Sequence, residues 1–151
     1  MADTISSEAR SKNMSRIRSC DTKPEIYLRK RLFSEGYRYR KNVSNIIGHP
    51  DLFFPKYKTV IFVHGCFWHH HPRCRYAYNP KSREDFWKDK FIRNAERDSF
   101  VKTEILKSDF KYMVVWECTV KKMMKSEEYS KEVVSLIRKF LTSDEEREFS
   151  I

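Results

Sequence analysis

The sequence lacks any long apolar run and contains little glycine. Only 3 of its 151 residues are glycine, and 5 are proline. No segment approaches the roughly 20 apolar residues that a membrane-spanning helix requires, which argues against a membrane protein. The first residues, Met-Ala-Asp-Thr-Ile-Ser-Ser-Glu, lack the apolar centre of a secretion signal, so we expect a cytoplasmic protein. Internal repeats and low-complexity linkers are absent too, and the length suits a single folded domain.

Cysteine is also scarce, with four residues, but two of them lie in one unusual segment. Residues 63–74 read Val-His-Gly-Cys-Phe-Trp-His-His-His-Pro-Arg-Cys and contain four of the five histidines. A buried imidazole must satisfy both a donor and an acceptor nitrogen, and metal coordination or proton transfer would do so. In a cytoplasmic chain, cysteines that cluster with histidines predict metal ligands better than disulfides.

Three residues of this segment have the short spacing of a structural zinc site, namely Cys66, His71 and Cys74. Zinc in such sites is tetrahedral, so a fourth ligand must come from elsewhere, and only Cys20 and Cys118 remain. We favour Cys118 because it closely follows an apolar run, residues 112–116, that is typical of a central strand. The alternative is a set of ordinary buried thiols beside a surface histidine run.

Composition and charge predict a globular protein with an anionic partner. Hydrophobic residues make up 40% of the chain, charged residues 34% and aromatic residues 15%, so the length allows one real core. The formal net charge is +10, and nucleic acid is the commonest partner of strongly basic proteins. Charge alone is weak evidence, because many soluble proteins are basic.

We divide the chain into a basic arm (residues 1–20), a single domain (residues 21–143) and an acidic tail (residues 144–151) that we expect to be frayed. In the arm, Met14 and Ile17 are three residues apart and would share one face of a helix, as two apolar wedges against DNA. The basic residues of the arm are Arg10, Lys12, Arg16 and Arg18. A disordered tail is the alternative for this segment.

The first helix of the domain has clear start and stop signals. Thr22 is predicted as the N-cap, Pro24 lies in the first turn, and Glu25 stands at the third position of a capping box. Gly36 is predicted to end the helix. Glu25 therefore has a structural role that competes with any catalytic one.

The next segment predicts strands, one of which carries a carboxylate. Residues 37–43 alternate in the manner of a half-exposed strand. Residues 49–54 and 59–64 predict an antiparallel hairpin, with Asp51 near the start of the first strand and His64 at the end of the second. Because both strands are mostly apolar, the carboxylate needs a partner, and a divalent cation is a natural one.

The second half of the chain predicts two further helices around one strand. Ser82, with Asp85 three residues later, is predicted to cap a long helix that runs to about Ser108. Residues 111–116 predict a strand, and Ser126 is predicted to cap a final amphipathic helix. The order of helix, strands, helix, strand and helix predicts an α/β fold with a mixed sheet and helices on both faces.

Two motifs resemble known nucleases. Pro50-Asp51 ahead of a hairpin partner resembles the restriction-endonuclease-like enzymes, although Phe62-Val63-His64 stands where they carry an acid and a lysine. Asp51, then Phe-Val-His-Gly-Cys-Phe-Trp-His-His-His and later Asn-Ala-Glu-Arg-Asp, resembles the very short patch repair (Vsr) mismatch endonucleases. The resemblance runs from Arg-Ser-Lys-Asn-Met at residues 10–14 to Val-Trp-Glu-Cys at residues 115–118.

The resemblance implies a restriction-endonuclease-like fold with a structural zinc site, and an enzyme that nicks DNA. The cut would lie 5′ of the T in a T·G mispair, which deamination of 5-methylcytosine leaves behind. The products would be a 3′ hydroxyl and a 5′ phosphate. A monomer is expected because a mispair offers no dyad, and a cytosine-5 methyltransferase would be a functional partner.

The resemblance also implies a site with two Mg²⁺ ions. Asp51 would be the carboxylate that both ions share, and the main-chain carbonyl of Val63 would complete one metal shell. His64 would hold a metal-coordinated water near the phosphate, and Glu25 would contact the metal waters unless it serves only as a helix cap. Two hard cations can stabilise the attacking and leaving oxygens of an in-line displacement.

For proton transfer, the resemblance implies that His69 is the general base and that Asp98 orients it. A neutral imidazole is a usable base at neutral pH, and a carboxylate fixes its tautomer. The zinc ligands implied are Cys66, His71, Cys74 and Cys118. In this chain Pro72 and Arg73 lie between the histidines and Cys74, whereas the family pattern allows one residue fewer.

DNA recognition is implied for aromatic and basic residues. Phe67, Trp68 and Trp87 would insert beside the mispair from the major groove, while Met14 and Ile17 would enter from the minor groove. Core packing is the alternative for the three aromatic residues. Candidates for phosphate contacts are Lys12, Arg16, Arg18, Lys88 and Arg93, although a solvated basic face would look the same.

Two other functions fit parts of the sequence. A zinc-stabilised DNA-binding module without catalysis explains the charge and the cysteines, but it leaves Asp51, His64, His69 and Asp98 without a role. A nuclease without mismatch specificity keeps the catalytic residues. Cleavage of a T·G duplex beside a fully paired duplex separates this nuclease from a repair enzyme.

Overall fold

The computed structural model describes residues 21–151, so the predictions for Cys20 and for the basic arm lie outside the described residues. Those arm residues are Lys12, Met14, Arg16, Ile17 and Arg18. The elements in chain order are α2 (Lys23–Ser34), β1 (Arg40–Lys41), β2 (Leu52–Phe54), the 3-10 turn η1 (Pro55–Tyr57), β3 (Thr59–His64), α3 (Glu84–Lys107), β4 (Lys111–Trp116), α4 (Glu117–Lys125), α5 (Glu127–Thr142) and β5 (Glu148–Ser150). Within the described part, no helix combines the length and apolar character needed to cross a membrane.

The five strands form one mixed sheet in the order β1-β2-β3-β4-β5. Strands β1, β2 and β3 are antiparallel neighbours, whereas β4 and β5 join β3 in parallel. The predicted hairpin is confirmed, with Leu52 opposite Ile61. The register of β3 and β4 pairs their last residues, His64 and Trp116, so both parallel strands end at the same edge of the sheet.

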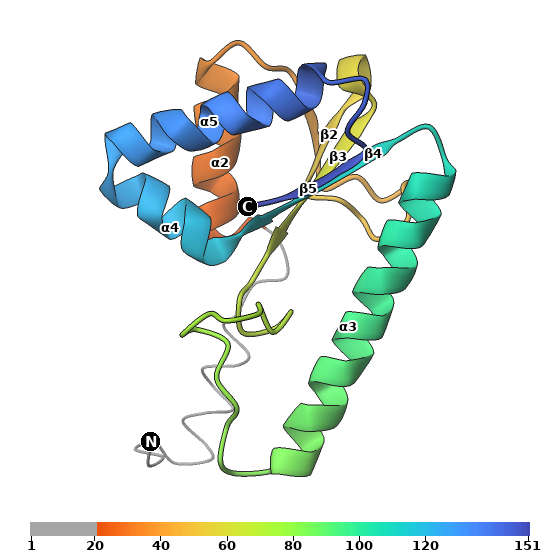
Figure 1. The fold of residues 1–151 in the computed structure, drawn as a ribbon, viewed down its shortest axis with the longest axis vertical. Helices are drawn as coiled ribbons and strands as arrows, with labels where there is room; N and C mark the ends of the chain where they lie inside the picture. Colours follow the sequence, from red (N-terminus) through yellow and green to blue (C-terminus); the bar gives the residue numbers. More distant parts are fainter. Residues whose placement is uncertain (1–20) are drawn as a thin grey trace.

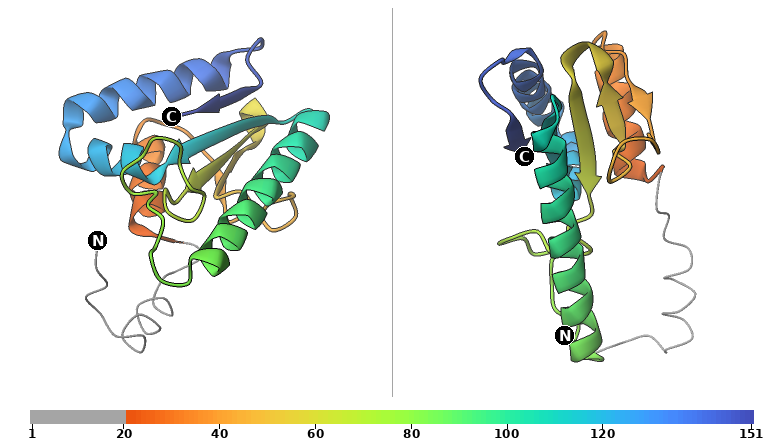
Figure 2. Two further views of the ribbon diagram at one scale, coloured as in Figure 1. Left: turned by 60° about the horizontal axis from the view of Figure 1, so that its bottom comes forward. Right: turned by 90° about the vertical axis from the view of Figure 1, so that its right-hand side faces the viewer.

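Helices cover both faces of this sheet, as predicted (Figure 1). On one face Ile61 and Met113 are fully buried in a core that α2, α4 and α5 cover. On the other face Val60 and Val114 pack with Ile105 of the long helix α3. Because successive strand residues point to opposite faces, the alternation along β3 decides which side chains reach α3. Figure 2 shows α3 running along one side of the sheet.

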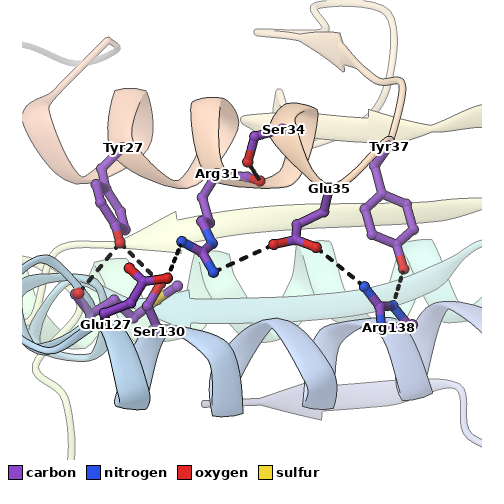
Figure 3. A network of polar contacts seen from close by, with 9 residues as sticks. Tyr27, Arg31, Ser34, Glu35, Tyr37, Glu127, Ser130 and Arg138 are labelled. Atoms are coloured by element: carbon purple, nitrogen blue, oxygen red, sulfur yellow. Dashed lines mark hydrogen bonds and ion pairs between the residues drawn. The ribbon is translucent and has the colours of Figure 1, made fainter.

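Polar contacts between α2 and α5 fix the position of α2 (Figure 3). Arg31 bridges Glu127 at 2.8 Å and Glu35 at 3.4 Å. The hydroxyl of Tyr27 lies 2.9 Å from the Ser130 hydroxyl. Arg138 adds an ion pair to Glu35 and a hydrogen bond to the Tyr37 hydroxyl. These contacts hold the helix that carries Glu25 against α5.

Most of the predicted helix signals are confirmed, but one is wrong. The Thr22 hydroxyl accepts the Glu25 main-chain N–H, and the Ser126 hydroxyl accepts that of Tyr129. Gly36 follows the end of α2 with a φ of +95°, a conformation that glycine adopts without strain. Ser82 does not cap α3, because the first turn closes on the Arg83 carbonyl, which accepts the Trp87 N–H.

The end of the chain contradicts the prediction of a frayed acidic tail at residues 144–151. Residues 148–150 form β5, which pairs in parallel with β4. Phe149 stacks on Phe140 at 5.7 Å, and the main chain of Ile151 bonds to Val114 and Trp116. Two apolar side chains and the unpaired edge of β4 therefore outweigh the acidic composition. The predicted strand at residues 37–43 is also shorter: β1 spans only Arg40–Lys41, and Asn42, with a left-handed φ of 48°, ends it.

Candidate active site and metal centre

Predicted site residues at the end of β3 and just beyond β3 and β4 meet at the edge where both strands end. His64 is the last residue of β3, and Trp116, its register partner, is the last residue of β4. Cys66 and Cys118 each lie two residues beyond this pair. The parallel register therefore explains why these two cysteines, 52 positions apart in the sequence, come together.

After β3 the chain coils into a compact turn over residues 65–71. His69 donates its main-chain N–H to the Gly65 carbonyl at 3.0 Å, and His71 donates to the Cys66 carbonyl at 2.9 Å. This turn returns His69 to the end of β3, where its ring stacks on that of His64 with centroids 3.8 Å apart and planes 5° apart.

Helix α3 supplies the carboxylate that contacts His69. The Asp98 Oδ2 atom lies 2.6 Å from the His69 Nδ1 atom. Asn94, one turn earlier, donates from Nδ2 to the Trp68 carbonyl at 2.8 Å and so fastens the turn to the helix. The stripe of α3 that faces the protein alternates steps of three and four residues, as helical periodicity requires. Its members are Trp87, Phe91, Asn94, Asp98, Val101 and Ile105.

His64 is buried, with 7% of its surface exposed. Burial, reinforced by the neighbouring His69, lowers the pKa of His64 to about 3. The ring is therefore neutral at neutral pH and keeps a lone pair on one nitrogen. Because the pKa of His64 is lower in the folded protein than in the unfolded chain, the neutral ring favours the folded state. This stabilisation is present above the usual pKa of histidine and declines as the pH falls toward about 3.

Asp51 lies directly before β2 and faces the adjoining strand. Its Oδ2 atom accepts the main-chain N–H of Val63 at 2.6 Å. Burial and, to a smaller extent, the nearby Glu25 carboxylate raise the pKa of Asp51 to about 7, against the opposing effect of the hydrogen bond from the Val63 N–H. Two carboxylates that disfavour each other's charge are a donor set suited to hard divalent cations. Asp51 and Glu25 therefore fit a Mg²⁺ site.

The capping role predicted for Glu25 is present, and it leaves the side chain close to Asp51. Glu25 is 5% exposed and accepts hydrogen bonds from the Asp21 main-chain N–H at 2.8 Å and from the Thr22 hydroxyl at 3.1 Å. Burial raises the pKa of Glu25. Glu25 can therefore cap the helix and still lie beside Asp51.

The four predicted zinc ligands come together, with all ligand atoms within 4.8 Å of one another. The His71 Nδ1 atom lies 3.5 Å from the Cys118 sulfur and 3.7 Å from the Cys66 sulfur. Tetrahedral zinc with Zn–S near 2.3 Å and Zn–N near 2.0 Å separates such ligands by about 3.6 Å. Three thiols and one imidazole at these distances therefore fit zinc.

The loop accommodates its longer spacing without moving the ligands apart. Pro72 and Arg73 are exposed, and Arg73 turns the chain with a left-handed φ of 59° before Cys74. The Trp116 ring stacks on His71 at 4.0 Å, with planes 8° apart, and fixes the orientation of that imidazole. The Cys118 main-chain N–H also donates to the Cys66 sulfur at 3.4 Å.

The aromatic residues predicted to contact DNA form a cluster beside this loop. The Phe67 ring lies 5.3 Å from the rings of Trp68, Trp87 and Phe91. Trp87 is only 8% exposed, whereas Phe67 and Trp68 are half-buried. Trp87 is therefore packed more tightly than Phe67 or Trp68. Its insertion into DNA would require the ring to leave the cluster. The exposed basic candidates Lys88 and Arg93 lie on α3.

Sequence reasoning missed Arg29, which lies beside the carboxylates. Arg29 is 8% exposed, pairs with Asp21 at 2.8 Å, and places its Nη1 atom 4.0 Å from the Glu25 Oε2 atom. It stands four residues after Glu25, a spacing at which two residues share a helix face. The spacing of Glu25 and Arg29 is therefore the sequence signal that could have identified Arg29.

Comparisons with known proteins identify the family. The model of the family described as "DNA mismatch endonuclease Vsr" matches residues 2–75. The type II nicking enzyme V.NmeAIP of Neisseria meningitidis is 49% identical over 121 residues, which cover 80% of this chain and 86% of that protein. The type II nicking enzyme V.XorIIP of Xanthomonas oryzae pv. oryzae is 42% identical over 78% of this chain and 86% of its own length. The DNA mismatch endonuclease Vsr of Escherichia coli is 37% identical over 80% of this chain and 77% of its length. The chain belongs to the Vsr family of DNA endonucleases.

Proposed function

We propose that this protein is a DNA mismatch endonuclease, a phosphodiester hydrolase that nicks one strand 5′ of the T in a T·G mispair. Such mispairs arise by deamination of 5-methylcytosine, and the nick would start very short patch repair. The observation that carries the proposal is the convergence of Asp51, His64, His69 and Asp98 at the end of β3. Membership of a family of DNA endonucleases supports the interpretation of this arrangement as a nuclease site.

In this proposal His69 is the general base. Asp98 accepts a hydrogen bond from the Nδ1 atom of His69 at 2.6 Å, so the proton stays on Nδ1 and the lone pair on Nε2 can take a proton from the attacking water. His64, neutral and stacked on His69, would hold water near the scissile phosphate. The products would be a 3′ hydroxyl and a 5′ phosphate.

Asp51, the main-chain carbonyl of Val63 and Glu25 would hold the two Mg²⁺ ions. When bound, these ions supply positive charge to the attacking and leaving oxygens of the displacement. The chain's own contribution is the placement of the carboxylates. The hydrogen bond from Val63 orients Asp51, and the α2 cap orients Glu25.

The zinc site would have a structural role in this enzyme. Cys66, His71 and Cys74 belong to the loop that carries His69, and Cys118 belongs to the first turn of α4. Zinc held by these residues would clamp the loop to the sheet edge. The overall fold would be restriction-endonuclease-like, with the enzyme acting as a monomer on double-stranded DNA and linked functionally to a cytosine-5 methyltransferase.

Mispair recognition would use aromatic wedges. Phe67 and Trp68 are half-buried at the surface of the loop beside His69, where they can reach a base step. Unstacking a base step costs a few kcal/mol and costs least at a mispair, so insertion favours mismatched DNA. Trp87, the more buried ring, would pack against Phe67 and Trp68 and support them. Met14 and Ile17 of the arm, with Lys12 and Arg16 on phosphates, would contact the opposite groove.

The Asp98→Asn variant is expected to lower the turnover of T·G duplex about a hundredfold or more without changing its affinity. The asparagine amide can donate to Nδ1, which would move the imidazole proton to Nε2 and remove the base's lone pair. Single-turnover nicking with saturating enzyme measures the rate, and equilibrium binding measures the affinity.

Two further variants separate positioning from structure for Asp98. His69→Ala and the double variant His69→Ala/Asp98→Asn should nick equally slowly, because Asp98 acts through His69. Ser99→Ala, an exposed position next to Asp98, should behave like the wild type. If the nicking rate of the double variant falls by the product of the two single losses, His69 and Asp98 do not act as a pair.

A second candidate is a nicking endonuclease without mismatch specificity. Two of the three relatives described above carry the name type II nicking enzyme, which favours this candidate. The test is Mg²⁺-dependent nicking of one labelled duplex that carries a T·G pair, compared with the same duplex carrying T·A. Equal nicking of both duplexes would support the alternative.

A further inference from the structure

A basic pocket lies on α2 beside the carboxylates of the proposed active site. Its volume is about 420 Å³. Four cationic side chains and two aromatic rings line most of it, namely Arg29, Lys30, Arg38, Lys41, Phe33 and Tyr39. Among the residues that the structure describes, no carboxylate lines this pocket. The proposed mechanism gives the pocket no role.

Arg29 forms the deepest charged group of the pocket. It is 8% exposed, and its Nη2 atom donates to Asp21 at 2.8 Å. Its Nη1 atom is buried and has no hydrogen-bond partner within residues 21–151. A buried N–H without an acceptor costs free energy, so Arg29 keeps unused hydrogen-bonding capacity beside the pocket. Glu25, at 4.0 Å, is too distant to serve as that acceptor.

At the mouth of the pocket, contacts within the protein hold Arg38 in place. The guanidinium of Arg38 lies 4.0 Å above the ring of Phe33, which is itself 52% exposed. Arg38 also donates to the Tyr37 carbonyl at 3.1 Å. Lys30 and Lys41 are exposed at the rim. Four cations around one cavity create a positive potential that concentrates an anion there.

We propose that this pocket binds a backbone phosphate of the DNA duplex, at a position outside the mispair. The inference deepens the proposed function, because it assumes that duplex DNA is the substrate. Arg29 contacts Glu25, and its charge acts on the carboxyl of Asp51, so a strand seated in the pocket passes next to the site of cleavage. Phosphate contacts fix register and carry no sequence information, so the pocket serves paired and mispaired DNA alike.

The test is equilibrium binding of the double variant Lys30→Gln/Lys41→Gln to a labelled duplex over a series of KCl concentrations. Each phosphate contact contributes about 0.9 to the slope of log K against log[KCl], so loss of the one phosphate contact should lower the magnitude of the slope by about 0.9. Affinity at moderate salt should fall about tenfold, equally for T·G and T·A duplexes. The exposed lysines of α5 provide a control of equal charge, Lys131→Gln/Lys139→Gln, which should keep the wild-type slope.

Arg29→Gln is the more direct variant, but it also removes the contact to Asp21, so its folding must be checked by thermal unfolding. The rim lysines are exposed, and their variants test the pocket without that risk. A pocket variant with the slope of the control, or a control that loses as much slope as the pocket variant, would overturn the proposal. Binding is measured without cleavage, so failure of the enzyme to nick T·G duplex would be distinguishable from failure of the pocket.

Discussion

Asp51→Asn is expected to abolish nicking and, at the same time, to stabilise the metal-free protein at about pH 8. The pKa of Asp51 is raised to about 7, so the folded protein binds a proton there more tightly than the unfolded chain does. That stability is fully present below about pH 4 and is lost as the pH rises through about 7. The shift of about 3 units sets an upper limit of about 4 kcal/mol.

Asparagine is a good probe of this carboxyl because it keeps the shape and removes the charge. Its amide oxygen can still accept the Val63 N–H. The free energy of unfolding should therefore rise by about 2 to 4 kcal/mol in chelator at about pH 8, and the two proteins should converge as the pH falls to about 4. The loss of nicking should reach about a thousandfold, since a shared metal ligand is removed.

Denaturant unfolding at a series of pH values measures this prediction, with Asp89→Asn, an exposed carboxyl on α3, as the control. Added Mg²⁺ should raise the thermal midpoint of the wild type and leave that of Asp51→Asn unchanged, because ligand binding to the folded state adds stability. If Asp51→Asn is less stable than the wild type in chelator, or if Mg²⁺ stabilises both proteins equally, the carboxylates do not form the metal site.

Cys118→Ser should have the largest effect on stability, with loss of bound zinc and of at least about 5 kcal/mol of unfolding free energy. Zinc would join the loop of Cys66 and His71 to the first turn of α4, and few other contacts could replace it. Burial raises the pKa of the Cys118 thiol, so zinc must displace its proton on binding. Nicking should fall at least about a hundredfold, because the same loop carries His69.

Elemental analysis of the purified protein measures the zinc, and urea unfolding measures the stability. The matched control is Cys20→Ser, which changes the one cysteine that is not among the proposed zinc ligands. It should retain one zinc per chain and wild-type nicking. Stoichiometric zinc in Cys118→Ser, or zinc loss in Cys20→Ser, would contradict the proposed ligand set.

The parts of the fold that local chemistry determines could be predicted from the sequence. Thr22 and Ser126 cap helices through bonds to residues three positions later, so both helix starts were predictable. The hairpin that faces Asp51 toward the adjoining strand follows from two apolar runs around a short turn. The sequence favours Cys118 as the fourth zinc ligand because residues 112–116 are typical of a central strand, and the structure places that strand beside β3.

The remaining features depend on contacts between distant segments. Strand β5 exists because β4 offers an open edge, which its own sequence does not reveal. Arg29 looks like any exposed basic residue of a helix until Asp21 and Glu25 enclose it. The burial of Trp87 likewise depends on how the loop at residues 65–71 folds back onto α3. Sequence periodicity identifies the inner stripe of α3, but it does not say what the stripe contacts.

The central claim is a mismatch-specific nick made with His69 as the base. The most direct measurement is single-turnover nicking, in Mg²⁺, of a labelled duplex with one T·G pair and of its T·A counterpart, by the wild type and by His69→Ala. The account predicts one cut 5′ of the T by the wild type, on the T·G duplex only, and none by the variant. Equal cutting of both duplexes would contradict mismatch specificity, and an undiminished rate in His69→Ala would contradict the assignment of the base.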